Sequence, residues 1–410
     1  MKKIKIYQIN LFYKLGSTGN LIFDLFQIAT KNDIEMRIAA RNSDGEYNEY
    51  YKCTSRREKT VHSILSRITG LQGYFSKQST LDLIDDIKRY EPDLIHLHNL
   101  HGHYINLGIL FQFLREYEKP IIWTLHDCWA FTGNCAYYTC EQCTQWKQSE
   151  GCNHCPNKRN YPFSYFFDRS HKMFQDKKNL YGKGMDINFV CVSNWLRYEL
   201  LQSFLYVYKA RTIYNYVDTS VFKIMEEIRS NKDNNQIILL GVCSVWSKLK
   251  GIEEIIHLSF NLPKNMYIIL IGHMNKIYRK MCKKSGIRLV GKLSSKEELI
   301  KYYNKADYVL SLSKAETFGM TVAEGQSCGT PAIVLNSTGI KELVDDNTGI
   351  LIDRYDSNEI IEKINIFESN KKKRSQFYCR TKAELFYSKE RQCQKYIELY
   401  KELAKKNERN

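Results

Sequence analysis

The chain has 410 residues, 43% hydrophobic and 26% charged, so it is long enough and apolar enough to bury the cores of two domains. No apolar run approaches the ~18 to 20 residues of a membrane-spanning helix, and polar residues interrupt the start, MKKIKIYQINLFY, so we expect neither an anchor nor a signal peptide and place the protein in the cytoplasm. The net charge of +16 is spread over both halves and fits nucleic acid, an anionic membrane face or phosphorylated small molecules equally well.

Short apolar runs recur along the first half, each followed by a turn and a longer segment with helical spacing. These runs are KIKIYQI (3–9), DLIHLHN (93–99), IIWTLHD (121–127) and NFVCVSN (188–194). Continuous apolar strands that alternate with helices indicate a parallel sheet covered on both faces. After the first strand, GSTGN predicts a turn into a helix that Ser17 or Thr18 can cap.

A cysteine-rich insertion is expected at 128–160, where strand-like runs are missing. Five cysteines fall within its residues 135–155: Cys135, Cys140, Cys143, Cys152 and Cys155. Two Cys-x2-Cys pairs, 140/143 and 152/155, have the spacing of a tetrahedral structural zinc site, in which Cys135 or His154 can replace one member. Such a closed site has no open position, so we expect no catalytic role for it. The alternative is a loop of free thiols.

The segment 158–174, KRNYPFSYFFDRSHKMF, interleaves basic and aromatic residues. This pattern suits an anionic membrane surface or a lipid-linked acceptor. It equally suits the core face of a helix with a solvated opposite side, and the residues alone do not decide between the two.

The second half repeats the pattern of the first. Its apolar runs are QIILLGVCSV (236–245), MYIILIG (266–272), IRLVG (287–291), DYVLSLS (307–313) and PAIVLN (331–336). We therefore predict two doubly wound domains, an N-terminal one over 1–213 and a C-terminal one over 214–388, followed by an amphipathic helix over 389–410. Ligands are expected beyond the carboxyl ends of the strands, in the cleft between the domains.

The stretch ETFGMTVAE places two carboxylates, Glu316 and Glu324, around one glycine between a strand and a helix. A helix N-terminus binds phosphate, and Gly319 lets a ligand approach the backbone. Glu324, about one turn into the helix, is placed to accept hydrogen bonds from a ribose diol. Glu316 lies where a group attached to the diphosphate would project. The stretch thus suits a nucleotide-sugar, whereas the alternative is a capping carboxylate and an exposed glutamate.

This Glu-x7-Glu run resembles the signature of the retaining GT-B glycosyltransferases of family 4. Other matches follow in order: GSTGN (16–20), TLHD (124–127), VSN (192–194), IYNYVDTSVF (213–222) and STGIKELVDDNTGILI (337–352). The first half, with LIHLHNLHGHYINLGIL and WTLHDCWAFTGNCAYY, is especially similar to the colanic-acid branch that builds bacterial surface polysaccharides. The resemblance implies a GT-B fold, two Rossmann-like domains facing a central cleft, with the last helix crossing back to the first domain.

The resemblance also implies roles for single residues. Glu316 and His126 would contact the transferred sugar near the reacting carbon. Glu324 would hold the ribose, and the diphosphate would lie on residues of three segments: Gly16, Ser17, Thr18, Gly19, Lys250, Phe318, Gly319, Met320 and Thr321. Val245 stands where the family carries a phosphate-binding arginine, so Lys248 or the helix N-terminus would have to carry more of that charge.

The predicted function is transfer of a sugar, with retention, from a UDP- or GDP-sugar to a saccharide or polyprenyl-diphosphate-linked acceptor. The pathway would be a capsule, O-antigen, lipopolysaccharide or exopolysaccharide one, and the enzyme would work at the cytoplasmic face of the anionic inner membrane. No catalytic cofactor and no nucleic acid are expected.

The sequence is compatible with two other functions. A basic zinc-containing nucleic-acid binder would explain the charge and the cysteines but not the strand–helix pattern with its glycine turns. A catalytically silent sugar-nucleotide binder is kept open by Val245.

Overall fold

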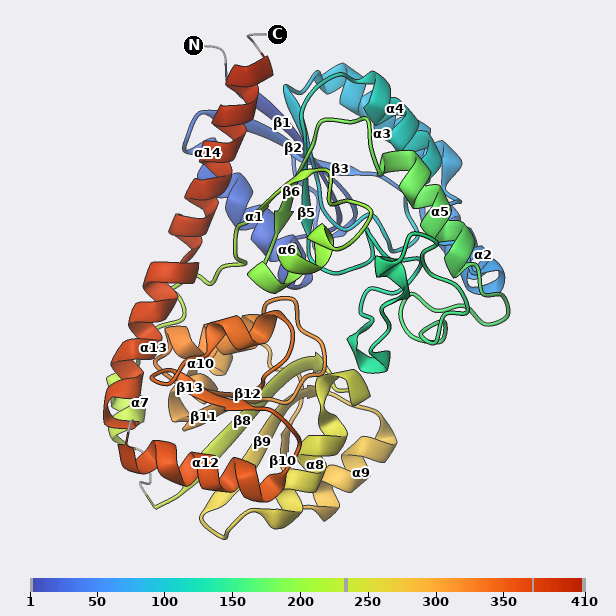
Figure 1. Ribbon diagram of the computed structural model, residues 1–410. Coiled ribbons are helices and arrows are strands. Elements are labelled where there is room, and N and C mark those ends of the chain that lie inside the picture. Colours follow the sequence, from blue (N-terminus) through green and yellow to red (C-terminus); the bar gives the residue numbers. More distant parts are fainter. Residues whose placement is uncertain (1–2, 232–234, 371, 408–410) are drawn as a thin grey trace. The chain divides into compact units, whose positions relative to one another are not determined.

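The computed structural model describes residues 3–231, 235–370 and 372–407 and divides the chain into two compact units. The N-terminal unit comprises Met1–Ile213 together with Cys393–Asn410, and the C-terminal unit comprises Tyr214–Gln392. Each unit is built around its own parallel sheet (Figure 1).

Seven strands of the described residues form the sheet of the N-terminal unit, and every neighbouring pair is parallel. Their spatial order is β3 (Tyr50–Lys52), β2 (Ile34–Ser43), β1 (Ile4–Tyr13), β4 (Leu94–Leu97), β5 (Ile121–Leu125), β6 (Ile187–Cys191) and β7 (Lys209–Thr212). This is the Rossmann order, in which the direction of winding reverses between β1 and β4.

The helices of this unit connect successive strands. They are α1 (Gly16–Thr30), α2 (Arg56–Thr69), α3 (Lys77–Tyr90), α4 (Leu107–Glu116), η1 (Thr139–Glu141), η2 (Gln145–Lys147), α5 (Ser170–Tyr181) and α6 (Asn194–Leu201). Alternate side chains of β5 face opposite layers. The Trp123 ring packs on Phe111 of α4 and Tyr181 of α5, whereas the Thr124 hydroxyl faces Tyr396 of α14 (Lys389–Asn407) on the other side.

The C-terminal unit repeats the same winding with six strands among the residues described. Their order is β10 (Arg288–Val290), β9 (Met266–His273), β8 (Ile237–Val245), β11 (Tyr308–Ser311), β12 (Ala332–Leu335) and β13 (Gly349–Ile352). The accompanying helices are α7 (Glu226–Ser230), η3 (Lys248–Lys250), α8 (Ile252–Asn261), α9 (Lys276–Lys284), α10 (Lys296–Lys305), α11 (Met320–Ser327), η4 (Gly339–Leu343), α12 (Ser357–Asn370) and α13 (Lys372–Tyr387).

The last helix, α14, begins in the C-terminal unit and continues into the N-terminal unit. Its apolar stripe is buried there: Ile397, Tyr400 and Leu403 are at most 3% exposed. Across the described ranges, no helix combines the length and the apolar character that crossing a bilayer requires.

Candidate active site

Loops that follow β8, β11 and β12 meet at the carboxyl edge of the second sheet. The Lys314 amide donates a hydrogen bond of 2.9 Å to the Leu249 carbonyl, which joins η3 to the loop after β11. The Gly339 amide donates one of 2.9 Å to the Glu316 carbonyl, which joins that loop to η4. Two predicted residues, Lys250 and Glu316, are thereby brought together from segments more than sixty residues apart.

The Lys250 ammonium donates to Glu316 Oε1 over 2.5 Å, and both side chains are about a quarter exposed. Burial lowers the pKa of Lys250, but the adjacent carboxylate outweighs burial and holds that pKa above its usual value. Lys250 therefore keeps its charge at neutral pH. An anion that reached this edge would find a fixed cation beside a carboxylate.

The helix α11 begins at Met320 directly after Gly319. Gly319 has a φ of +109°, and a Cβ there would lie 2.8 Å from Ile340 Cγ1, so the turn needs glycine. The side chains of Met320 and Thr321 are half-buried at the helix N-terminus. Phe318 is only 2% exposed, and its ring packs on Tyr387. Its side chain is therefore part of the core, and only its backbone is free to face a ligand.

Glu324 lies one turn into α11, half-buried, and accepts a hydrogen bond of 2.8 Å from the Tyr303 hydroxyl. Burial raises the pKa of this carboxyl to about 7, and the Tyr303 bond only partly offsets that effect. Tyr303 was missed from the sequence, because nothing in the spacing of α10 links it to the glutamate.

Val245 ends β8 at the position where an arginine was expected, and its side chain is 61% exposed. Lys248, the suggested substitute, is 71% exposed and lies 3.9 Å from Glu253. In this structure the carboxyl edge of the second sheet thus pairs Lys250 with Glu316, whereas Lys248 faces Glu253.

The first glycine loop differs from its prediction. The helix α1 begins at Gly16, and its N-cap is Leu15, which makes no side-chain capping bond. Ser17 and Thr18 therefore lie inside the first helical turn and do not cap it. Gly19 is buried against β1, where a Cβ would lie 3.2 Å from the Phe12 carbonyl oxygen. The small residues let the helix start close to the strand end.

His126 lies just after β5 and is 9% exposed. Its Nε2 lies 3.2 Å from Nδ1 of His98, which follows the neighbouring strand β4. Burial lowers the pKa of His126 to about 4, so the ring is neutral at pH 7. His96, within β4, is bonded to the Tyr400 hydroxyl at 2.7 Å and to the Thr124 hydroxyl at 2.8 Å.

A second histidine cluster at the same edge was not predicted as a unit. His101 Nε2 lies 2.7 Å from Asp127 Oδ2, and its Nδ1 lies 2.9 Å from the Tyr161 hydroxyl. Burial raises the pKa of Asp127, but His101 reverses this and holds the pKa below its usual value. His101 and Asp127 follow adjacent strands, and that adjacency is the signal that could have brought them together.

The five cysteines between 135 and 155 form no disulfide and have different surroundings. Cys135 and Cys152 are buried, Cys143 and Cys155 are half-buried, and Cys140 is exposed. Within the described part of the chain, no group of three or more histidine, cysteine, aspartate and glutamate side chains is placed to hold a metal ion. The structural zinc stays a prediction of the spacing, and metal analysis of the purified chain tests it.

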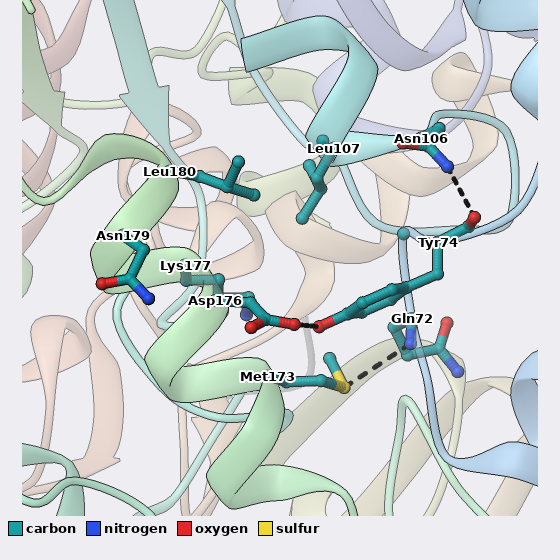
Figure 2. A pocket seen from close by; sticks show the side chains of 11 residues that line it. Gln72, Tyr74, Asn106, Leu107, Met173, Asp176, Lys177, Asn179 and Leu180 are labelled. Atoms are coloured by element: carbon teal, nitrogen blue, oxygen red, sulfur yellow. Dashed lines mark hydrogen bonds between the residues drawn. The ribbon is translucent and has the colours of Figure 1, made fainter. Parts of the chain in front are cut away.

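A cavity of about 240 Å³ lies in the N-terminal unit where α4 and α5 approach the loop after α2. Figure 2 shows the Tyr74 ring beside it, with its hydroxyl bonded to Asp176 at 2.5 Å. Asn106 donates to the Tyr74 carbonyl, and Leu107 and Met173 supply apolar walls. No residue assigned to the donor lines this cavity.

Comparison with known proteins identifies the family to which this chain is similar. One family model, described as Glycosyltransferase Family 4, matches residues 18–221, and a second, Glycosyl transferases group 1, matches residues 221–384. Among curated relatives, the chain is 22% identical over 379 residues to WcaC of Escherichia coli (strain K12), a glycosyl transferase assigned to colanic acid biosynthesis; the match covers 88% of this chain and 90% of WcaC.

Solved structures agree on the fold. Sucrose-phosphate synthase from Thermosynechococcus elongatus superposes with a TM-score of 0.71 at 15% identity, covering 98% of this chain and 99% of that one. Anabaena Alr3699/HepE, solved with UDP-glucose, superposes with a TM-score of 0.67 at 16% identity, covering 98% and 100%. The predicted α/β GT-B fold is confirmed, and the chain belongs to glycosyltransferase family 4.

Proposed function

We propose that this glycosyltransferase moves a sugar from a nucleotide-diphosphate donor, a UDP- or GDP-sugar, to a saccharide or polyprenyl-diphosphate-linked acceptor. The product would be a bacterial surface polysaccharide, made at the cytoplasmic face of the membrane. The observation that carries the donor assignment is the Lys250–Glu316 pair beside the N-terminus of α11. The solved complexes of HepE with UDP and with UDP-glucose support the same donor class.

In this proposal the C-terminal unit binds the donor. The α11 N-terminus and Lys250 take the diphosphate, since unsatisfied amides and an ammonium both favour negative charge. Glu324 accepts hydrogen bonds from the ribose diol. Glu316, fixed by Lys250, orients the hydroxyls of the sugar.

Transfer proceeds with retention and without a dedicated protein base. The acceptor oxygen forms its bond to the anomeric carbon on the face that the diphosphate leaves, and a diphosphate oxygen takes the hydroxyl proton. The protein supplies positioning and stabilises the departing negative charge. His126, neutral at pH 7, contacts the sugar by hydrogen bonding, and no divalent cation is required.

The donor class is tested by thermal unfolding with UDP, GDP, ADP and their sugars. A ligand at ~100 times its dissociation constant adds about 2.7 kcal/mol of stability, which is readily seen. We expect one diphosphate to stabilise the wild type, Glu324→Ala to lose that effect, and His126→Ala to keep it. Incubation with the matching sugar nucleotide and an acceptor, with EDTA present, then tests transfer, and NMR of the product gives the anomer. If no diphosphate binds while RNA does at ~0.2 M salt, the proposal is wrong.

A further inference from the structure

The helix α2 presents apolar side chains to solvent and polar ones to the core. Val61, Ile64 and Ile68 are 53%, 52% and 41% exposed. His62 and Ser66, on the opposite side of the helix, are 1% and 0% exposed. A surface helix normally has the reverse arrangement, and an exposed apolar stripe of this kind marks a contact surface.

Polar contacts fix this orientation. His62 Nδ1 lies 2.7 Å from the Ser76 hydroxyl, and Ser66 Oγ donates to the His62 carbonyl over 2.6 Å. The His62 ring also packs against Phe75 and His103. Rolling the helix to bury its apolar stripe would break these contacts, so the stripe stays outside.

The loop before α5 extends the stripe. Tyr165, Phe166 and Phe167 are 59%, 67% and 51% exposed, and the Tyr165 amide donates to the Arg67 carbonyl of α2 over 2.8 Å. Figure 1 shows this green loop next to α2. We call the six side chains together the apolar face: Val61, Ile64, Ile68, Tyr165, Phe166 and Phe167.

Exposed cations lie on the segments that carry the apolar face, whereas two carboxylates of these segments accept hydrogen bonds from backbone amides. The exposed cations on α2 and on the segment leading into α5 are Arg56, Arg57, Arg159 and Arg169. The Arg169 guanidinium lies over the Phe167 ring, 5.5 Å from its centroid. Glu58 accepts the Ser79 amide at 3.2 Å, and Asp168 accepts the Cys155 amide at 2.6 Å.

We propose that the apolar face docks on an anionic phospholipid bilayer. Protruding aliphatic and aromatic side chains enter the boundary between headgroups and acyl chains, and surrounding arginines bind the headgroup phosphates. Residues that follow these two segments line the cavity of Figure 2: Tyr74 comes after α2, and Met173 comes after the loop. A lipid-borne acceptor would therefore be presented beside that cavity. The docking argument rests on this surface and does not depend on the reaction.

Cosedimentation of the full chain with vesicles tests the proposal. With about 30% phosphatidylglycerol in phosphatidylcholine, the wild type should pellet, and the Ile64→Gln/Ile68→Gln/Phe166→Ser variant should bind at least tenfold more weakly. These side chains are exposed, so the fold should tolerate their loss. Phe260→Ser/Ile277→Gln removes two apolar side chains of the C-terminal unit that are 59% and 70% exposed, and it should bind as the wild type does.

Charge is tested separately. Arg57→Gln and Arg169→Gln should each weaken binding to anionic vesicles roughly fivefold and leave binding to pure phosphatidylcholine unchanged. Two results would overturn the proposal: a wild type that stays in the supernatant with anionic vesicles at about 0.1 M salt, or a triple variant that pellets as the wild type does. If the triple variant changes the oligomeric state while vesicle binding persists, the face is an interface between copies instead.

Discussion

The two units wind their strands in the same order, yet the carboxyl edges of their sheets are equipped differently. In the C-terminal unit the edge carries a charged pair, Lys250 and Glu316, next to a helix N-terminus. In the N-terminal unit it carries neutral histidines such as His126 and His96, bonded to another histidine or to buried hydroxyls, next to the His101–Asp127 pair. The same fold thus presents a lysine and a helix N-terminus at one edge and mostly neutral hydrogen-bonding histidines at the other, and the difference lies in the residues that follow the strands.

The largest expected effect comes from the charged pair. Glu316→Gln keeps the shape of the side chain but removes the charge that fixes Lys250 at 2.5 Å. We expect the transfer rate to fall by about 10² to 10³, the range for losing one preorganised electrostatic group. Steady-state kinetics with a saturating donor measures this. Glu359→Gln, which alters a half-buried ion pair with Lys363, serves as the control. A Glu316→Gln enzyme with full activity would remove this residue from the site.

The shared winding was predictable from sequence, because buried parallel strands are continuous apolar runs such as 266–272 and 331–336. The proximity of Lys250 and Glu316 required no more than knowing that both follow neighbouring strands. Other features could not be predicted from the sequence. Ser17 and Thr18 are plausible caps by residue type, yet the helix begins one residue before them. The orientation of α2 was hidden for a different reason: periodicity identifies an apolar stripe but does not say which way it faces.

The second prediction concerns the turn that starts α11. Gly319→Ala adds a Cβ 2.8 Å from Ile340 at a φ of +109°, so strain and overlap act together. We expect the free energy of unfolding to fall by about 3 kcal/mol. Gly286→Ala is the matched control: its φ is +80°, but nothing lies within 4 Å of the new Cβ, so only about 1 kcal/mol should be lost. Equal losses in urea titrations would show that Ile340 moves aside freely.

The third prediction concerns pH and separates Glu324, the residue proposed to bind the ribose, from the rest of the edge. The pKa of Glu324 is about 7 in the folded protein against 4.5 ordinarily. Between these values the folded chain keeps a proton that the unfolded chain has released, so the free energy of unfolding falls as pH rises from 4.5 to 7. Half-burial limits this to about 2 kcal/mol.

Glu324→Gln is the matched variant, because its amide oxygen can still accept from Tyr303. Its free energy of unfolding should lose that part of the pH dependence and exceed the wild-type value above pH 7. Identical pH profiles for the two proteins would mean that Glu324 ionises normally.

The smallest expected effect tests whether the carboxyl edge of the second sheet lacks a phosphate-binding cation. Val245 occupies the position that the family gives to an arginine, and its side chain is 61% exposed, so Val245→Arg should be tolerated. A guanidinium there would share the diphosphate with Lys250. We expect the nucleoside diphosphate that stabilises the wild type to bind about fivefold more tightly, the value of one partly exposed charge-assisted contact. Val207→Arg, at a 54% exposed site of the N-terminal unit, adds the same charge elsewhere and should leave the affinity unchanged. Calorimetric titration measures both. If Val245→Arg does not tighten binding, Lys250 and the amides of α11 already neutralise the diphosphate, and the missing arginine is compensated within the edge itself.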